Sequence, residues 1–314
     1  MPIICYAITR EDLMRYYSVA EIAQKWSMSE RGVRNYCAQG RIEGAFLKGK
    51  TWMIPDGATK PEKKLTTSQR PSSSLLARLK EEKHSRRKGG IYQKLQIDMT
   101  YNSNHMEGSQ LTHEQTRYIY ETNTIGLENT ILQVDDIVET ANHFRCIDLM
   151  IDRATFTLSE AFIKQLHATL KTGTSDSRKD WIGIGAYKKL PNEVGGLETV
   201  PPEQVAEQMQ ALLASYHSIE EKTLDDILEF HVHFDLIHPF QDGNGRVGRL
   251  IMFKECLRSN ITPFIITDDM KLYYYRGLSE WKRERGFLRD TCLAAQDTFR
   301  QYLDYFRIPY DTKS

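Results

Sequence analysis

The sequence contains few cysteines, and they are not arranged in pairs. In 314 residues there are five of them, at Cys5, Cys37, Cys146, Cys256 and Cys292. Their odd number and wide spacing, with no Cys-x-x-Cys pair, argue against a disulfide framework and against a cysteine zinc site. Free thiols are typical of a reducing compartment, so we expect a cytoplasmic protein.

Long apolar runs are also absent. No stretch approaches the roughly 18–20 apolar residues that a membrane-spanning helix needs. The short apolar patch from Pro2 to Ile8 has no basic region before it, which argues against a signal peptide. The sequence therefore predicts neither a membrane span nor secretion.

The chain has no net charge, because 42 Lys and Arg balance 42 Asp and Glu. A zero balance gives no support to binding of nucleic acid or membrane by the chain as a whole. The charge is unevenly placed, however. Residues 16–90 carry 16 basic and 7 acidic side chains, a net charge of +9, and the remainder carries −9. A basic head on an acidic body indicates different partners for the two parts.

The basic head begins with signals for two helices and a hairpin. Ser18 with Glu21 three residues later forms a capping-box pattern, which predicts a helix start at Ser18. A second helix is expected from Ser29 to Gly40, because glycine commonly ends helices. Residues 46–54 read as two short strands that turn at Gly49-Lys50.

This arrangement resembles the winged helix-turn-helix units of the excisionase and MerR type over residues 16–60. The stretch from Gly40 to Ala45, followed by Trp52 to Pro55, carries the resemblance. It implies a DNA-binding domain at residues 1–60, with the second helix in the major groove. The implied contacts to bases and phosphates are Arg31, Arg34, Asn35, Arg41, Lys48 and Lys50. The alternative is a solvated basic face that binds protein or only packs.

A linker and a second, larger domain follow. Residues 61–74 are rich in Thr, Ser, Pro and Lys and show no apolar periodicity, which indicates a linker. Residues 75–314 then read as a mainly α domain that opens with a charged helix over 75–87. An irregular hairpin or flap is expected at 181–200, where glycines alternate with apolar residues. Further helices are predicted at 91–101, 112–120, 128–151, 158–170, 202–217, 223–237, 244–258 and 275–283.

The chemistry gathers in His238 to Arg249, which reads HPFQDGNGRVGR. It follows a helix with an apolar face and contains a glycine-rich loop before a new helix. Backbone N–H groups at such a helix start form an anion nest. Arg246 and Arg249 lie one turn apart and can face one anion. Asp242 offers an oxygen ligand for Mg²⁺ bridged by phosphates, and His238 offers a base with a pKa near neutrality.

The segment resembles, at every defining position, the active-site motif of the Fic (filamentation induced by cAMP) family. The resemblance extends from about residue 95 to 290. Ser103 to Gly108 is similar to the inhibitory motif of that family, placed upstream of the active site on a helix at about 98–108. The helix from Leu158 to Leu170, the flap, and the pair Tyr274-Tyr275 also have counterparts in the family.

The resemblance implies a self-inhibited protein adenylyltransferase that uses ATP and Mg²⁺. His238 would deprotonate a Ser, Thr or Tyr hydroxyl of a target protein, or of the chain itself, and Asp242 would hold Mg²⁺. Glu107, with Ser103, would pair with Arg249 in the space of the γ-phosphate. The implied nucleotide contacts are Gly243, Asn244, Gly245, Arg246, Arg249, Val194, Gly195, Tyr274 and Tyr275.

Several alternatives stay open on the sequence. Lys282 stands near where some family members have an asparagine after the tyrosine pair, so the preferred nucleotide is undecided. The same pocket could remove AMP or transfer another phosphate-containing group. The chain could instead be a DNA-binding regulator or a toxin-like module, and a homo-oligomer is compatible with it. His231 and His233 suggest a metal site only superficially, because on a helix they point to different sides.

Overall fold

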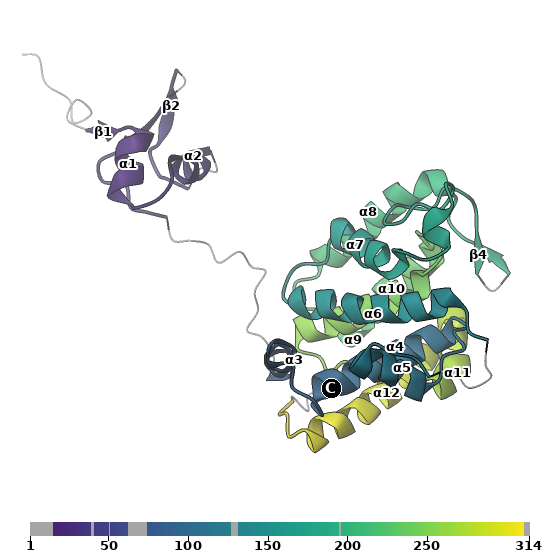
Figure 1. Cartoon of the computed structure of the whole chain (residues 1–314). Coiled ribbons are helices and arrows are strands. Elements are labelled where there is room, and N and C mark those ends of the chain that lie inside the picture. Colours follow the sequence, from purple (N-terminus) through teal and green to yellow (C-terminus); the bar gives the residue numbers. More distant parts are fainter. Residues whose placement is uncertain are drawn as a thin grey trace, which may run out of the picture. The chain divides into compact units, whose positions relative to one another are not determined.

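The computed structural model describes residues 15–38, 41–49, 51–61, 74–126, 131–194 and 196–310. The chain divides into two compact units, residues 1–67 and residues 68–314 (Figure 1). Helices dominate the element order, so the mainly α class expected from the sequence is confirmed.

The first unit combines two helices with a small antiparallel sheet. Its elements are β1 (Tyr16–Tyr17), α1 (Val19–Lys25), α2 (Glu30–Ala38), β2 (Phe46–Lys48) and β3 (Thr51–Pro55). The predicted capping box is confirmed, because Ser18 and Glu21 exchange hydrogen bonds between side chain and backbone. The predicted hairpin is confirmed too, with Lys48 opposite Thr51. Strand β1 pairs with the far edge of β3, and at two residues it is too short to show an alternating pattern.

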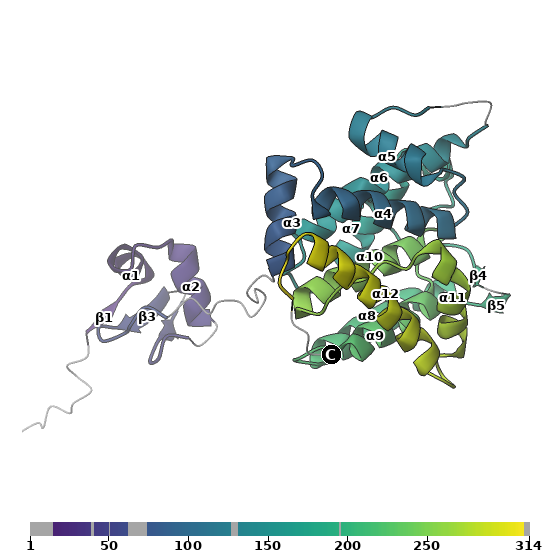
Figure 2. The same cartoon turned by 90° about the horizontal axis from the view of Figure 1, so that it is seen from below.

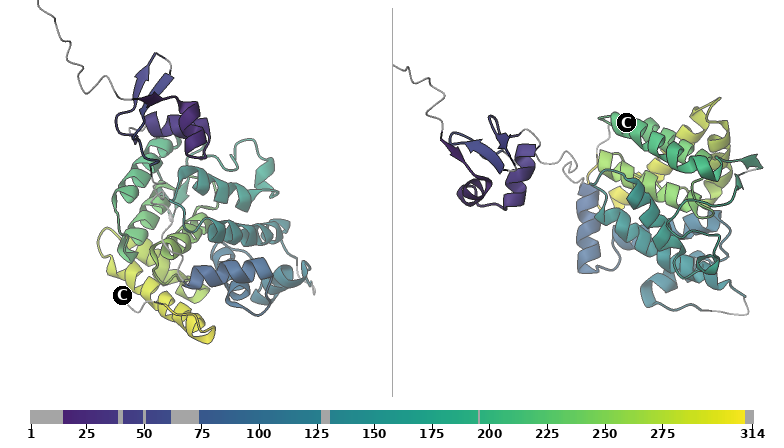
Figure 3. Two further views of the ribbon diagram at one scale, coloured as in Figure 1. Left: turned by 90° about the vertical axis from the view of Figure 1, so that its left-hand side faces the viewer. Right: turned by 90° about the horizontal axis from the view of Figure 1, so that it is seen from above.

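The second unit is built of ten α-helices among its described residues, with one two-stranded hairpin. The helices are α3 (Ser74–Ser85), α4 (Ile91–Met106), α5 (His113–Thr122), α6 (Val134–Asp152), α7 (Glu160–Lys171), α8 (Pro202–Ser218), α9 (Leu224–Ile237), α10 (Asn244–Ser259), α11 (Lys271–Glu280) and α12 (Gly286–Tyr305). Short 3₁₀ turns η2 (Asp176–Arg178) and η3 (Asp268–Met270) and the strands β4 (Glu193–Val194) and β5 (Leu197–Glu198) complete it. The hairpin projects from the side opposite α3 (Figures 2 and 3).

Helix α10 occupies the centre of this unit. Thirteen of its sixteen residues are buried, and it packs against α4, α6, α7 and α9. A helix buried all round is normally apolar, yet the first turns of α10 carry Arg246 and Arg249. Both guanidinium groups are buried, so each needs carboxylate partners from neighbouring helices. The sequence of α10 therefore demands the charged network that surrounds it.

Most predicted helix boundaries hold to within two residues, but α4 runs to Met106, five residues past its predicted end, and α6 begins at Val134 instead of residue 128. The C-terminal part differs more. Helix α12 is absent from the prediction, although Leu288, Cys292, Ala295, Phe299 and Leu303 recur at helical spacing and are buried. That apolar stripe is a detectable local signal. Helix α11 begins at Lys271, four residues earlier than expected.

The state of the cysteines and the apolar character of the helices can be compared with the expectations from the composition. Cys37, Cys146, Cys256 and Cys292 are free and buried, whereas Cys5 lies outside the described residues. Over the part of the chain that the structure describes, no helix combines the length and the apolar character needed to cross a membrane.

Candidate active site

The motif forms a tight connection between α9 and α10. Helix α9 ends at His238, whose φ of 49° is left-handed; Pro239 follows, and the residue before a proline is disfavoured in the α region. Gly243 adopts a φ of +81° immediately before α10, which a glycine does without strain. The helix–loop–helix that the sequence predicts is confirmed, and it presents His238 at the rim of the N-terminus of α10.

The imidazole of His238 is oriented by its own helix. Its Nδ1 lies 3.3 Å from the carbonyl oxygen of Asp235. A carbonyl only accepts, so Nδ1 carries the proton and Nε2 keeps its lone pair. Burial lowers the pKa of His238 below its usual value, and the nearby Lys188 cation lowers it further. The ring is therefore neutral and able to accept a proton at neutral pH.

Two side chains hold the loop in shape. The ring of His167 stacks on Phe240 with centroids 4.0 Å apart. Its Nε2 donates to the carbonyl of Asp242, and its Nδ1 accepts from the backbone N–H of Gly185. Asn244 closes the loop by bonding both the N–H and the carbonyl of Phe240 at 2.8 Å. The side-chain amide of Asn244 is thus committed to the loop, and the backbone of Asn244 stays available for a nucleotide contact.

Glu107 reaches this helix start from α4. A methyl group added at Gly245 would lie 2.4 Å from its carboxylate Oε1 and 3.0 Å from Nη1 of Arg249. The carboxylate therefore rests against the first turn of α10, where the positive end of the helix dipole favours an anion. A larger side chain at 245 would force the carboxylate of Glu107 to move.

Arg249 binds Ser103 and Glu107 through three hydrogen bonds. Its Nη2 donates to Glu107 Oε1 at 2.7 Å and to the carbonyl of Ser103 at 2.9 Å, and its Nε donates to Ser103 Oγ at 3.0 Å. Burial opposes ionisation of Glu107, but the charges of Arg249 and Arg246 keep its pKa below the usual value. Glu107 is thus ionised at neutral pH. The structure brings Ser103, Glu107 and Arg249 together as the resemblance implies.

Arg246 points into a different network. It pairs with Glu139 of α6 and, at 3.3 Å, with Oδ2 of Asp242. Lys171, at the end of α7, lies within 2.5 Å of Glu139, 2.8 Å of Asp176 and 2.6 Å of Asp242. Arg246 and Arg249, which the sequence suggested could face one anion, thus contact different carboxylates. Arg246 forms an ion pair with Asp242, and Arg249 forms one with Glu107.

No pattern in the sequence links the motif to three members of this network, Lys171, Glu139 and Asp176. Burial disfavours the charged form of Lys171, yet the carboxylates around it raise its pKa above the usual value. Burial likewise disfavours ionised Asp242, but Arg246 and Lys171 hold its pKa well below its ordinary range. Lys171 and Asp242 are therefore both charged at neutral pH.

Comparison with known proteins places this site in a family. Residues 157–256, which span α7 to the end of α10, match the Fic/DOC family. The chain contains a Fic/DOC family domain. Its active-site loop and His167 both lie within the matched region.

Named relatives and solved structures extend the likeness beyond that region. Protein adenylyltransferase fic-1 of Caenorhabditis elegans is 24% identical over 217 residues, and protein adenylyltransferase Fic of Drosophila persimilis is 28% identical over 242 residues. These alignments cover 67% and 74% of this chain but 42% and 43% of the relatives. The chain thus spans less than half the length of these relatives.

Two solved structures share the fold of the Fic domain. A Fic domain containing signaling protein from Bacteroides thetaiotaomicron has a TM-score of 0.56 and 24% identity, and the match covers 73% of this chain and 90% of that one. Fic-1 from Caenorhabditis elegans has a TM-score of 0.56 and 20% identity, with 74% and 71% covered. At these identities the likeness concerns the fold.

A cavity of about 550 Å³ lies between the flap, α9 and α11, and its lining reaches Asp235 and Leu236 near the end of α9. The sequence-predicted residues Val194 and Tyr275 line it, whereas Gly195 lies outside the described residues. Tyr274 does not line it. Its lining residues are Val194, Glu198, Thr199, Val232, Asp235, Leu236, Tyr275, Arg276, Leu278 and Ser279.

Tyr274 has a structural role instead. It is fully buried, and its hydroxyl lies 2.5 Å from Nε2 of His231. His231 is buried as well, whereas His233, two residues later, is exposed and pairs with Glu229. Lys282 is exposed, and the lining of the cavity does not include it.

Lys188 fixes the flap beside the motif. Its ammonium donates to Asn192 at 2.7 Å, to Thr199 at 2.6 Å and to the carbonyl of Ile237 at 3.3 Å. Burial lowers its pKa to about 8. The amide of Asn192 in turn donates to the carbonyl of Phe240. Both ends of the flap are therefore tied to the active-site loop, a role that the sequence alone does not reveal.

Replacing Lys171 with methionine should strongly destabilise the Fic domain. The variant keeps the volume but leaves the carboxylates of Glu139 and Asp176 without their shared cation, so we expect the free energy of unfolding to fall by about 3–5 kcal/mol. Urea denaturation followed by circular dichroism measures this loss. The control Lys179→Met removes a 43% exposed side chain from the same Asp176 and should cost less than about 1 kcal/mol. Equal losses for the two variants would contradict a structural network around Lys171.

Proposed function

We propose that this chain is a self-inhibited protein adenylyltransferase, which transfers AMP from ATP to a Ser, Thr or Tyr hydroxyl of a protein. The observation that carries the proposal is the position of Glu107. Its carboxylate lies on Arg249 and against Gly245, at the start of α10. A protein anion there marks the place where the phosphates of a nucleotide would bind. The relatives named protein adenylyltransferase support the same activity.

The geometry of the loop supplies the base for this reaction. Because Nδ1 of His238 is committed to the carbonyl of Asp235, its Nε2 takes the proton of the target hydroxyl. The hydroxyl oxygen then forms a bond to the α-phosphorus, the bond from that phosphorus to the bridging oxygen breaks, and pyrophosphate leaves with the electron pair. The backbone N–H groups of Gly243, Asn244 and Gly245 stabilise the charge that develops on phosphate oxygens.

Asp242 fits the role of a magnesium ligand. Its side chain is 48% exposed beside the loop, and Lys171 and Arg246 keep it ionised. A single carboxylate plus phosphate oxygens is the donor set that Mg²⁺ favours in nucleotide sites. When bound, Mg²⁺ neutralises charge on the phosphates.

The flap and its cavity account for the two substrates. The cavity beside Tyr275 has a volume of about 550 Å³, which suits a nucleoside. Among the described residues, strands β4 and β5 pair with each other and with no third strand, so a target segment can add to their outer edge through main-chain hydrogen bonds. The hydroxyl of such a segment would be held near His238.

The direct test is mass spectrometry of the full chain after incubation with ATP and Mg²⁺. The Glu107→Gly variant should show an AMP adduct on itself or on proteins added as acceptors. The absence of any adduct, together with no release of pyrophosphate, would rule out the transferase. Loss of AMP from a modified acceptor, without transfer, would favour the removal reaction instead.

The first unit favours a second function, DNA binding. Helix α2 buries Val33 and Cys37 and exposes Arg31, Arg34 and Asn35 on the opposite side. This is the division expected of a recognition helix. Arg41, Lys48 and Lys50 would add phosphate contacts; Lys50 lies outside the described residues, and Phe46 and Leu47 beside Lys48 are exposed.

Binding of the full chain to a random-sequence DNA duplex should weaken as salt rises, because counterions are released. The double variant Arg31→Ala, Arg34→Ala should lose about tenfold in affinity and reduce the slope of log affinity against log salt by about 2. Gel shifts over a salt series measure both quantities. The control Arg283→Ala changes an exposed arginine of the Fic domain and should leave binding unchanged. No shift even at low salt would eliminate DNA binding.

A further inference from the structure

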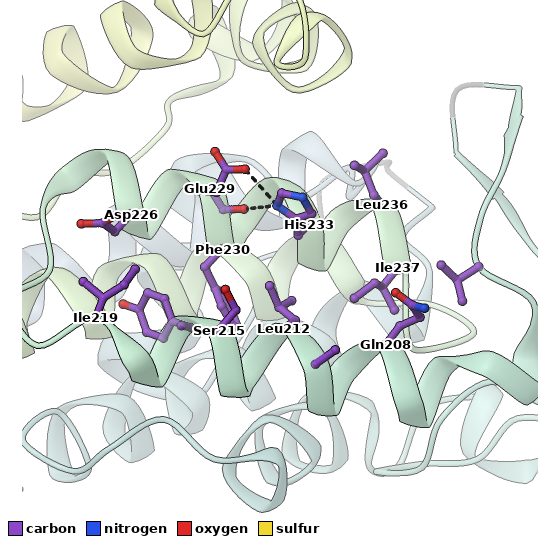
Figure 4. Close-up of a pocket in the computed structure, with 13 residues that line it drawn as sticks. Gln208, Leu212, Ser215, Ile219, Asp226, Glu229, Phe230, His233, Leu236 and Ile237 are labelled. Carbon is purple, nitrogen blue, oxygen red and sulfur yellow. Dashed lines mark hydrogen bonds and ion pairs between the residues drawn. The ribbon is translucent and has the colours of Figure 1, made fainter.

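A second cavity lies on the outside of the Fic domain, between α8 and α9 (Figure 4). Its volume is about 540 Å³. The cavity described above is lined by Val232 and Asp235 of α9 instead, and the two cavities share only Leu236. Its lining residues are Val200, Gln208, Ala211, Leu212, Ser215, Tyr216, Ile219, Asp226, Glu229, Phe230, His233, Leu236 and Ile237.

The lining forms two parallel stripes at helical spacing. From α8 and its end come residues 208, 211, 212, 215, 216 and 219, and from α9 come 226, 229, 230, 233, 236 and 237. Each set follows the three- and four-residue steps of one helix face. The helices are consecutive and packed side by side, so the groove extends over about eleven residues of α8, or about 16 Å. That length matches roughly three turns of a further helix.

The groove has an apolar floor and open walls. Tyr216, Phe230 and Ile237 are buried at its base, whereas Ala211 and Leu236 are exposed on its sides. An exposed concave apolar surface of this kind, rimmed by polar groups, is typical of a site for a protein helix.

The helical pair that forms the groove is strongly acidic. Residues 202–237 contain eight Asp and Glu, one Lys and no Arg. Some of these acids are neutralised locally, because Asp225 pairs with Arg289 and Glu229 with Arg285. Glu203, Glu207 and Glu221 are exposed along the same pair of helices. The field around the groove is therefore negative and attracts a cationic partner.

We propose that this groove binds a basic amphipathic helix of a partner protein, with apolar side chains in the groove and Lys or Arg facing the acidic rim. An extended strand, with its two-residue period, does not match two stripes at helical spacing. A second copy of the same face would bring like charges together and place one groove over another. At one end, Val200 adjoins the flap and Ile237 precedes His238, so a docked partner lies beside the active site.

The test is binding of a synthetic helical peptide to the full chain, followed by fluorescence anisotropy. The probe carries leucines at three- and four-residue spacing, flanked by lysines; a second probe has glutamates in place of the lysines. The basic probe should bind with an affinity that falls as salt rises, and the acidic probe should bind at least about tenfold more weakly. His238→Ala should bind the basic probe normally, which separates docking from catalysis.

Two tryptophan variants of α8 locate the binding site. Ser215→Trp fills the groove from an exposed position and should weaken binding at least about tenfold, whereas Gln210→Trp, exposed on α8 outside the lining, should not change it. Glu207→Lys with Glu221→Lys should weaken the basic probe and favour the acidic one. The proposal fails if the basic probe does not bind, if both probes bind equally, or if Ser215→Trp has no effect. It also fails if the chain dimerises and Ser215→Trp makes it monomeric.

Discussion

The Glu107→Gly variant should transfer AMP roughly a hundredfold faster than the unaltered chain. In the structure the carboxylate of Glu107 takes the hydrogen bonds of Arg249 and the space beside Gly245. Its removal frees a buried guanidinium for the phosphates of ATP, and one such donor contributes about 10²–10³ in rate when it is aimed at developing charge. The initial rate of label transfer from α-labelled ATP measures the gain.

Two further variants test how Glu107 lowers the rate of AMP transfer. Glu107→Gln keeps the volume and removes the charge, so an intermediate gain would show that the carboxylate acts by both charge and bulk. Glu114→Gly removes an exposed glutamate of α5 that pairs with its neighbour Arg117, and should leave the rate unchanged. If Glu107→Gly transfers AMP no faster than the unaltered chain, the contact with Arg249 is structural and the self-inhibition is wrong.

His238→Ala should abolish most of the activity that Glu107→Gly releases. Measured in the Glu107→Gly background, the loss should be about 10²–10⁴-fold, the range for removal of a general base. The nucleotide should still bind, because the N–H groups of α10 and Arg249 remain. The matched control is His233→Ala, an exposed histidine of the same helix, which should keep the full rate.

The pH profile gives a second readout of His238. Burial and the Lys188 cation lower its pKa below the usual value of 6.5, and the base works only in its neutral form. The rate of Glu107→Gly should therefore stay level as pH falls from 8 toward about 6.5 and decline only at lower pH. A decline that begins above pH 7 would show that another group accepts the proton.

The fold of the Fic domain could be predicted to a large extent because its signals are local. A helix-spaced apolar stripe or a glycine before a helix is complete within a few residues, as in α9 and at Gly243. Helix α12 carries the same kind of signal. The active-site motif is contiguous too, so its base, loop and arginines could be named before their geometry was known.

Contacts between side chains that lie far apart in the sequence could not be predicted. Lys171 meets Asp242 across 71 residues, and Arg246 meets Glu139 across 107. A helical pattern tells which side of a residue is buried, but it carries no information about which buried side chain of another helix lies opposite. The commitment of Asn244 to the loop, the burial of Tyr274, and the separation of Arg246 from Arg249 all follow from such packing.

The sequence alone determined the order of the helices, the position of His238 and the residues of the loop, since backbone preference and apolar spacing act over a few residues. Only the tertiary structure decided which ion-pair partner each buried charged side chain has. Bringing α4, α6 and α7 against α10 buries two arginines in a medium of low polarity, where an unpaired charge is too costly. Each arginine therefore takes the carboxylate that packing supplies, Glu139 for Arg246 and Glu107 for Arg249.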